Sequence, residues 1–167
     1  MHRRSCSLAL ALLGVFVACS GGGGSATRSS SSSAGPAPTV TTPTSLSKPD
    51  YLERANEICT TRNEQLARIP NAGDDPAAVA GVLQQSASIV ARALKDMRNL
   101  PIPAGDEPVV TVYFNKVDQL LATTADLAAA YQSGDASKAK DLQSQALQLQ
   151  TDANASANAY GMTACGA

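Results

Sequence analysis

KPDYLERANEICTTRNEQLARI, residues 48–69, is the stretch of sequence that decides the fold. Its apolar and small residues recur every three or four positions, which is the spacing of one face of an amphipathic helix. Ser47 is suited to cap the first turn, Pro49 fits within that turn, and Pro70 stops the helix. We therefore expect a helix over residues 48–69. Its apolar face holds Tyr51, Leu52, Ala55, Ile58, Cys59, Leu66 and Ile69.

Three further helical stretches follow, each bounded by capping residues, prolines or glycines. Apolar residues keep the helical period in each of them, including the valine-rich start of the third, and no segment alternates with the period of a strand. The expected boundaries are Asp75-Pro76 to Pro101, Asp106 or Glu107 to Gly134, and Asp135 to Gly161.

Four helices joined by short loops predict an all-α fold, an up-down-up-down four-helix bundle over residues 48–167. The fourth helix has mostly alanine on its apolar face. Alanine permits close approach of helices but buries little area, at ~25 cal/mol per Å². A covalent crosslink would therefore stabilise this bundle more than one with a larger core.

The amino end has the pattern of an export signal. Arg3 and Arg4 precede the uncharged apolar run LALALLGVFVA, residues 8–18. As a helix this run rises about 16 Å, roughly half of the hydrocarbon core of a bilayer. Such a run is too short to span a membrane and suits the middle of a secretory signal. We expect residues 1–18 to be a signal peptide that is removed.

The residues around the cleavage site point to a lipid anchor. Val17-Ala18-Cys19 resembles the lipobox of bacterial lipoproteins, in which the cysteine carries diacylglycerol through a thioether, with palmitate-type acyl chains. Phe16 departs from the lipobox, which prefers leucine at that position, but it suits the ordinary signal peptidase no better. We expect lipidation at Cys19, and a plain secretory signal followed by a cysteine stays open as the alternative.

Residues 20–47 consist almost entirely of Ser, Gly, Thr, Pro and Ala. This composition buries too little apolar surface to offset the entropy of ordering the chain. We interpret residues 19–47 as the lipidated cysteine and a tether that holds the bundle at the outer face of the cell membrane.

Cysteine counting predicts one disulfide. Cys6 leaves with the signal and Cys19 carries lipid, so Cys59 and Cys165 remain, and such pairs usually form a bridge outside the cytoplasm. Cys59 lies about 15 Å along the first helix. Five residues of extended chain after Tyr160 reach at most about 17 Å, so the carboxyl tail can fold back to Cys59. Two free buried thiols are the alternative.

Four short motifs follow one another along the folded region. They are YLERANEIC (51–59), LPIPAGDE (100–107), the turn at residues 133–135, and AYGMTACG (159–166). Together they resemble a group of small secreted helical proteins and lipoproteins from actinobacteria. The resemblance covers roughly residues 49–167. It implies export, a helical bundle and a cysteine pair, and it implies no substrate.

Charge and histidine content argue against nucleic-acid binding and catalysis. The net charge is −1, and removal of Arg3 and Arg4 leaves 11 basic against 14 acidic residues, with no basic run. The single histidine, His2, leaves with the signal peptide. The mature chain therefore lacks the commonest general base and the commonest transition-metal ligand. We expect a protein that is not an enzyme and that has no cofactor.

Paired carboxylates have ordinary structural interpretations. Glu53 and Glu57 lie four residues apart but off the apolar stripe, where a solvated face is expected. The pairs Asp74-Asp75 and Asp106-Glu107 each precede a proline and are expected to cap helices, since calcium needs more oxygen ligands than either pair offers. No metal site is predicted.

Two functions remain open. The first is a non-catalytic envelope lipoprotein that acts through protein contacts. The second is a carrier of a lipid or small apolar ligand in a cavity of the bundle. Asn56, beside the apolar stripe, is expected to make a polar contact inside the bundle rather than to face a partner. The candidate ligand-binding residues of a carrier are Tyr51, Tyr113, Tyr131 and Tyr160.

Overall fold

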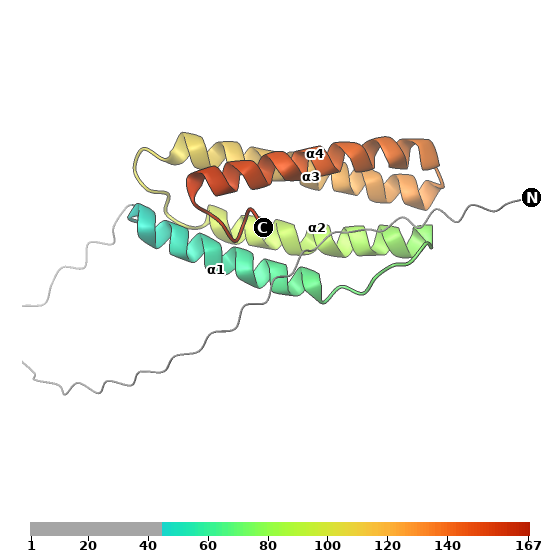
Figure 1. Ribbon diagram of the computed structural model, residues 1–167, viewed down its shortest axis with the longest axis horizontal. Coiled ribbons are helices and arrows are strands. Elements are labelled where there is room, and N and C mark those ends of the chain that lie inside the picture. The colour runs from blue at the N-terminus through green and yellow to red at the C-terminus, as the bar shows by residue number, and fades with distance from the viewer. Residues whose placement is uncertain (1–44) are drawn as a thin grey trace, which may run out of the picture. The chain divides into compact units, whose positions relative to one another are not determined.

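Four α-helices make up the folded region in the computed structural model, which describes residues 45–167. Successive helices run in opposite directions (Figure 1), so the predicted all-α, up-down-up-down architecture is confirmed, and no strand occurs within these residues. The signal peptide, Cys19 and nearly all of the tether lie outside the described residues. The helices are α1 (Lys48–Ala67), α2 (Pro76–Arg98), α3 (Glu107–Ser133) and α4 (Ala136–Tyr160).

Three of the predicted caps form as expected. The Ser47 hydroxyl accepts a hydrogen bond from the amide of Asp50 at 3.3 Å. The Asp75 carboxylate accepts from the amides of the second and third residues of α2 at 3.3 and 3.2 Å. The Asp135 carboxylate accepts from the amide of Lys138 at 3.0 Å. Each cap satisfies amide groups that have no partner inside the helix.

The start of α3 differs from the prediction. Asp106 occupies the capping position but makes no capping hydrogen bond. Its carboxylate instead accepts from the Tyr160 hydroxyl at 2.8 Å. The neighbouring Glu107 carboxylate accepts from the amide of Gly105 at 2.9 Å. Asp106 therefore binds the end of α4 instead of capping α3.

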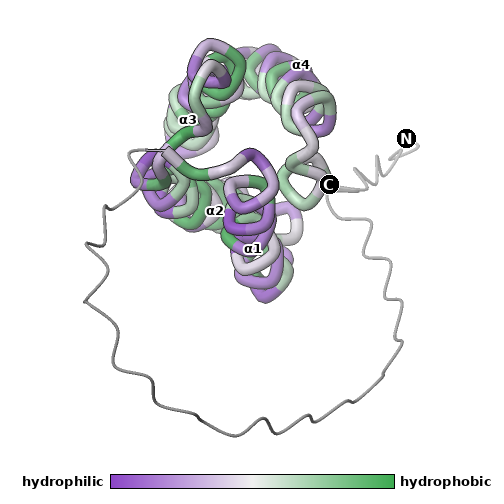
Figure 2. The backbone as a smooth tube through the Cα atoms, turned by 90° about the vertical axis from the view of Figure 1, so that its left-hand side faces the viewer, coloured by the Kyte–Doolittle hydropathy of each residue, from purple (hydrophilic) through white to green (hydrophobic). Residues whose placement is uncertain are grey.

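Among the four described helices, the backbones approach each other closely only between consecutive ones: α1 and α2, α2 and α3, and α3 and α4. Viewed along the bundle, α2 lies between α1 and α3, and the carboxyl terminus lies between α4 and α1 (Figure 2). By length and composition α2 could cross a membrane, but here it is packed between two helices. Residues 161–167, hereafter the tail, close the seam between the first and last helices.

The core divides into a large and a small cluster. The large one lies in what we call the tail half, formed by α1, the end of α2, the start of α3, the end of α4 and the tail. Its fully buried large side chains are Tyr51, Met97, Val110, Tyr113 and Met162, with the two cysteines.

The small cluster lies in what we call the far half, residues 76–86, 123–133 and 136–147. It consists of Leu127, Ala130 and Ala139, with Leu83, Tyr131 and Leu142 packed against it and only partly buried. The division follows from helix length, because α1 has 20 residues and α3 has 27. Figure 1 shows α2 and α3 running past the end of α1.

Candidate functional site

The predicted disulfide between Cys59 and Cys165 is present and lies inside the tail half. The two Cα atoms are 5.0 Å apart, and the bond links residues 106 positions apart in the chain. Cys59 is 0% and Cys165 1% exposed, so solvent does not reach the sulfur atoms. The tail folds back along α1, as the reach of the chain after Tyr160 predicts.

Polar side chains of α1 hold the main chain of the tail. The Asn56 carbonyl oxygen accepts from the amide of Ala164 at 2.9 Å, and its amide group donates to the carbonyl of Gly161 at 3.4 Å. Asn63 donates to the carbonyl of Ala164 at 2.9 Å. Arg62 donates to the carbonyls of Ala164 and Cys165 at 3.4 Å each. The expected internal contact of Asn56 is confirmed, whereas Arg62 and Asn63 were not anticipated from the sequence.

Two glycines shape the path of the tail. Gly161 ends α4 with a φ of 106°, a conformation that other residues rarely adopt, and a side chain there would crowd Leu52. Gly166 lies directly against Asn158, whose side chain donates to the Gly166 carbonyl at 3.2 Å. Met162 follows the first of these glycines and is 0% exposed. The turn therefore directs a methionine and a cysteine into the core within five residues of the helix end.

Met97 of α2 completes the surroundings of the disulfide. Its sulfur atom lies 3.9 Å from the Cys59 sulfur and 4.0 Å from the Cys165 sulfur. The methionine is 1% exposed. Three elements, α1, α2 and the tail, therefore meet at one buried group of sulfur atoms.

Tyr160 connects three elements at the point where the described chain begins. Its hydroxyl donates to Asp106, whose carboxylate also lies 3.6 Å from the Lys48 ammonium group. Lys48 additionally sits 4.2 Å from the centre of the Tyr160 ring. Burial, and then the neighbouring Asp106 carboxylate, raise the pKa of Tyr160. This tyrosine therefore serves to join α1, the α2–α3 loop and α4.

Tyr51 packs edge-on against Tyr160, with ring centres 6.1 Å apart. It is 0% exposed, and its hydroxyl is the one buried side-chain polar atom without a hydrogen-bond partner within residues 45–167. Burial, with a smaller contribution from Tyr113, raises the pKa of Tyr51 to about 12. A neutral hydroxyl in this position loses its hydration without full compensation.

Tyr113 and Arg62 are neighbours beneath the tail. Burial raises the pKa of Tyr113, and the Arg62 guanidinium acts in the opposite direction. Burial also lowers the pKa of Arg62, while the tyrosine opposes that shift. Besides the tail carbonyls, Arg62 donates to the side-chain oxygen of Asn63 at 2.7 and 3.0 Å. Neutral oxygen atoms surround this partly buried cation.

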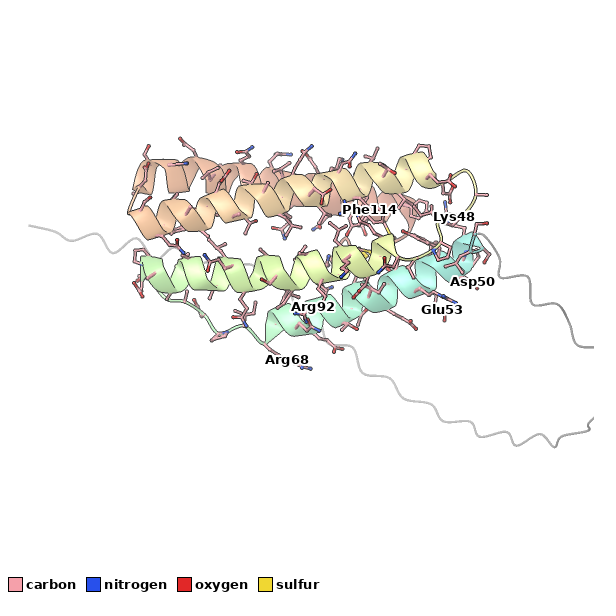
Figure 3. All side chains as sticks on the ribbon, turned by 180° about the vertical axis from the view of Figure 1, so that it is seen from behind. Lys48, Asp50, Glu53, Arg68, Arg92 and Phe114 are labelled. Atoms are coloured by element: carbon pink, nitrogen blue, oxygen red, sulfur yellow. A yellow bond between two sulfur atoms is a disulfide. The ribbon has the colours of Figure 1, made fainter. Side chains whose placement is uncertain are left out.

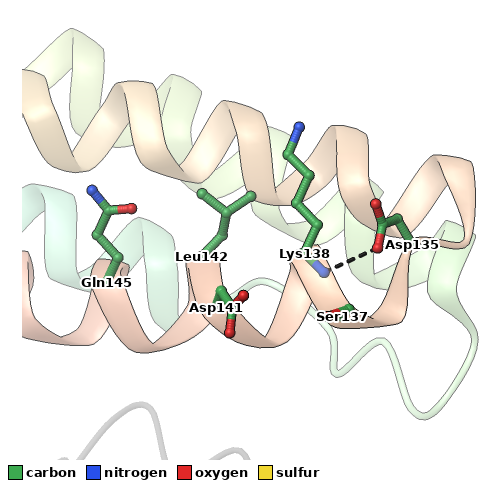
Figure 4. A pocket seen from close by; sticks show the side chains of 6 residues that line it. All are labelled: Asp135, Ser137, Lys138, Asp141, Leu142 and Gln145. Carbon is green, nitrogen blue, oxygen red and sulfur yellow. Dashed lines mark hydrogen bonds between the residues drawn. The ribbon is translucent and has the colours of Figure 1, made fainter.

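The four tyrosines do not converge on one pocket. Tyr51, Tyr113 and Tyr160 are core residues of the tail half, while Tyr131 packs in the far cluster. A hollow of about 400 Å³ lies along the start of α4 (Figure 4), lined by Leu142 and polar residues. A second, of about 240 Å³, lies between α1 and α2. Both hollows open to solvent, and neither is lined by a tyrosine.

The carboxylates considered for catalysis or metal binding are dispersed. Glu53 and Glu57 are exposed, and Glu53 projects from the outer side of α1 (Figure 3). Asp75 caps α2, and Asp106 binds Tyr160 and Lys48. Within residues 45–167, no group of three potential metal-ligating side chains comes together.

No protein-family model, curated protein or solved structure matches this chain.

Proposed function

We propose that this chain is a non-catalytic, lipid-anchored lipoprotein of the cell envelope, similar to the secreted helical proteins of actinobacteria, and that it acts through protein contacts at the outer face of the membrane. Cys19 carries the lipid, residues 20–47 form the tether, and the bundle presents the contact surface. The buried disulfide supports the proposed location, because such bonds persist in oxidising compartments.

The proposal of a contact surface rests on two exposed valines of α3, Val109 and Val112, which we call the apolar step. Val109 and Val112 are 52% and 50% exposed and lie one helical turn apart. The amide of Val109 donates to the carbonyl of Asp106, whose side chain contacts Lys48. The step therefore lies close to the point where the described chain begins. A partner docking there would meet the first turns of α3, close to Lys48 at the start of α1.

Carriage of a lipid or small apolar ligand is the competing function. It requires an apolar cavity, and the tyrosines that would line one are instead packed against each other and against the tail. Native mass spectrometry of the chain from an exporting host tests this function directly. A reproducible extra mass on the bundle that survives delipidation of Cys19 would favour the carrier.

The anchor is tested by labelling cells with an alkyne-bearing fatty acid. We expect the label on the wild-type chain and on Cys6→Ser, and none on Cys19→Ser. Cys6→Ser is the matched control, because it also replaces a cysteine of the amino-terminal region but leaves Cys19 in place. A label that persists in Cys19→Ser would refute lipidation at this residue.

The contact surface is tested with a photo-crosslinking amino acid at Thr111, an exposed position between the two valines. We expect a discrete crosslinked species in cells that disappears in the double variant Val109→Ser/Val112→Ser. Leu147→Ser is the matched control, because Leu147 is 49% exposed on a different helix. A crosslink that is insensitive to the two valines, or equally sensitive to Leu147, would contradict this surface.

A further inference from the structure

The seam between α1 and α4 differs from the three interfaces between consecutive helices in how it is filled. At the other three, the backbones of consecutive helices lie close together. Between α1 and α4, Tyr51 and Lys48 contact Tyr160 at the start of α1, and the tail lies farther along α1, where it is bonded to Cys59.

Met162 and Cys165 are the buried side chains of the tail, and they belong to the same core cluster as Tyr51 and Ala55 of α1. The Cys165 sulfur lies 3.6 Å from the carbonyl oxygen of Ala55. Beyond its contacts with Tyr160, attachment of α1 therefore depends on α2 on one side and on the tail on the other.

Hydrogen bonds hold the tail mainly through its main chain. Asn56 and Asn63 each make one hydrogen bond of 2.9 Å, while the contacts from Arg62 and the second contact of Asn56 are 3.4 Å long. Thr163 and Ala167 point into solvent. The disulfide is the only covalent closure of this seam in the described residues.

Burial makes reduction of the disulfide dependent on movement of the tail. With the sulfur atoms 0–1% exposed, a thiolate cannot reach either of them while the tail is in place. Lifting residues 161–167 breaks their hydrogen bonds to side chains of α1 and to Asn158 and uncovers Met97, but it leaves the contacts of α2 with α3 and of α3 with α4 in place. A local opening is thus the shortest route to the disulfide.

We propose that the tail is a redox-dependent strap. In the disulfide form it holds α1 against α4. After reduction by a dithiol the tail is released, the α1–α4 seam opens, and Tyr51, Met97 and Met162 become exposed while α2, α3 and α4 stay packed. The inference needs only thiol chemistry and does not depend on the proposed lipid anchor or partner surface.

The exchange of bonds is as follows. The residues on either side of Cys165 lift first and open a path to its sulfur, which is still bonded to Cys59. One thiolate of the dithiol then attacks the Cys165 sulfur, the disulfide breaks, and Cys59 leaves as a thiolate that takes up a proton. The second thiolate of the reductant then attacks the mixed disulfide and releases the Cys165 thiolate, which is also protonated. Two electrons pass from the dithiol, which becomes a disulfide, to the protein.

The rate of reduction by dithiothreitol, followed at increasing urea below the unfolding transition, tests the local opening on the unmodified chain. Local lifting predicts a rate that rises much less steeply with urea than the unfolding equilibrium constant, because little surface is exposed. A rate that follows the global unfolding constant would overturn the proposal.

Side-chain variants sharpen this test. Removing the two shorter contacts in Asn56→Ala/Asn63→Ala should accelerate reduction by about 10- to 100-fold. Asn115→Ala is the matched control, because Asn115 is exposed on α3 and distant in sequence from the tail contacts, and it should leave the rate within about twofold. Equal rates in the two variants would contradict a strap held by these residues.

Hydrogen exchange of the Cys59→Ser/Cys165→Ser chain tests the opened state. We expect residues 51–67 and the tail to exchange at least about tenfold faster than in the oxidised wild type, with much smaller changes in α3 and in α4 up to Ala153. Uniform acceleration in all four helices would mean that the bundle unfolds as one unit. Unchanged exchange in α1 would mean that the tail is not a strap. Either result would overturn the proposal.

Discussion

In the tail half, the core holds three tyrosines, two methionines and a disulfide, whereas in the far half it holds Leu127, two alanines and partly buried neighbours. The tail half has five packed elements because α1 and the tail add to the other three helices. The far half has only α2, α3 and α4. The number of elements that enclose a segment, more than its own hydropathy, sets how much of it is buried.

Among the changes considered, loss of the disulfide in the tail half should lower the free energy of unfolding most. The bond closes a loop of 106 residues, for which the chain-entropy model gives a stabilisation of about 4–5 kcal/mol. We expect Cys59→Ala/Cys165→Ala to lower the free energy of unfolding by about 3–5 kcal/mol in urea titration, after both proteins are checked for folding by circular dichroism. A midpoint that does not move would contradict the stabilising role of the bond.

Truncation of leucines should separate the two halves. Leu94 is 2% exposed in the tail half, and Leu94→Ala should cost about 2–5 kcal/mol. Leu142 is only partly buried in the far half, and Leu142→Ala should cost about 1–2 kcal/mol. Thermal and urea unfolding of the two variants measure the two losses of stability. Equal losses would show that the far half contributes as much per side chain as the tail half.

Alkaline pH should destabilise the tail half selectively. Tyr51 has a pKa raised to about 12, and the pKa values of Tyr113 and Tyr160 are also raised. Between the ordinary tyrosine pKa near 10 and these values, the unfolded chain loses protons that the folded chain keeps. The free energy of unfolding should therefore be constant below about pH 9 and fall from pH 10 to 12.

Urea midpoints and phenolate absorbance, followed together over this pH range, check the prediction. Tyr51→Phe should reduce the steepness of the fall. If stability stays constant to pH 12, or if the Tyr51→Phe chain has the same pH dependence, the buried tyrosines do not control alkaline stability.

The smallest expected effects come from single tyrosine hydroxyl groups. Tyr51→Phe removes a buried hydroxyl that has no partner and should leave stability unchanged or raise it by up to about 1 kcal/mol. Tyr160→Phe removes the hydrogen bond to Asp106 and should lower stability by about 0.5–1.5 kcal/mol. A larger loss in Tyr51→Phe than in Tyr160→Phe would reveal a partner for the Tyr51 hydroxyl.

The sequence predicted the helices well because their signals are local. Caps at Ser47, Asp75 and Asp135 and the left-handed glycines at the ends of α3 and α4 depend on adjacent residues alone. The disulfide was predictable by cysteine counting and the reach of the chain. The failed cap at Asp106 shows the limit, since its competing partner Tyr160 lies 54 residues away.

Long-range features were not predictable from periodicity. Periodicity alone does not distinguish the apolar positions of α2 from one another, yet Leu94 and Met97 are buried while Val79 and Val82 are only partly so. That difference depends on where α1 ends, which periodicity does not determine. Likewise, Arg62 and Asn63 lie on the polar side of the helical pattern of α1. No local signal in the sequence indicates that they donate hydrogen bonds to the tail.

Native-state hydrogen exchange of the oxidised chain tests the contrast between the halves most directly. We predict the slowest exchange in the tail half, around Tyr113–Val117 and Ala153–Ala157, and faster exchange in the far half, residues 123–133 and 136–147. This order follows from the distribution of buried side chains and from the disulfide. Equal protection along α3 and α4, or stronger protection in the far half, would contradict the account.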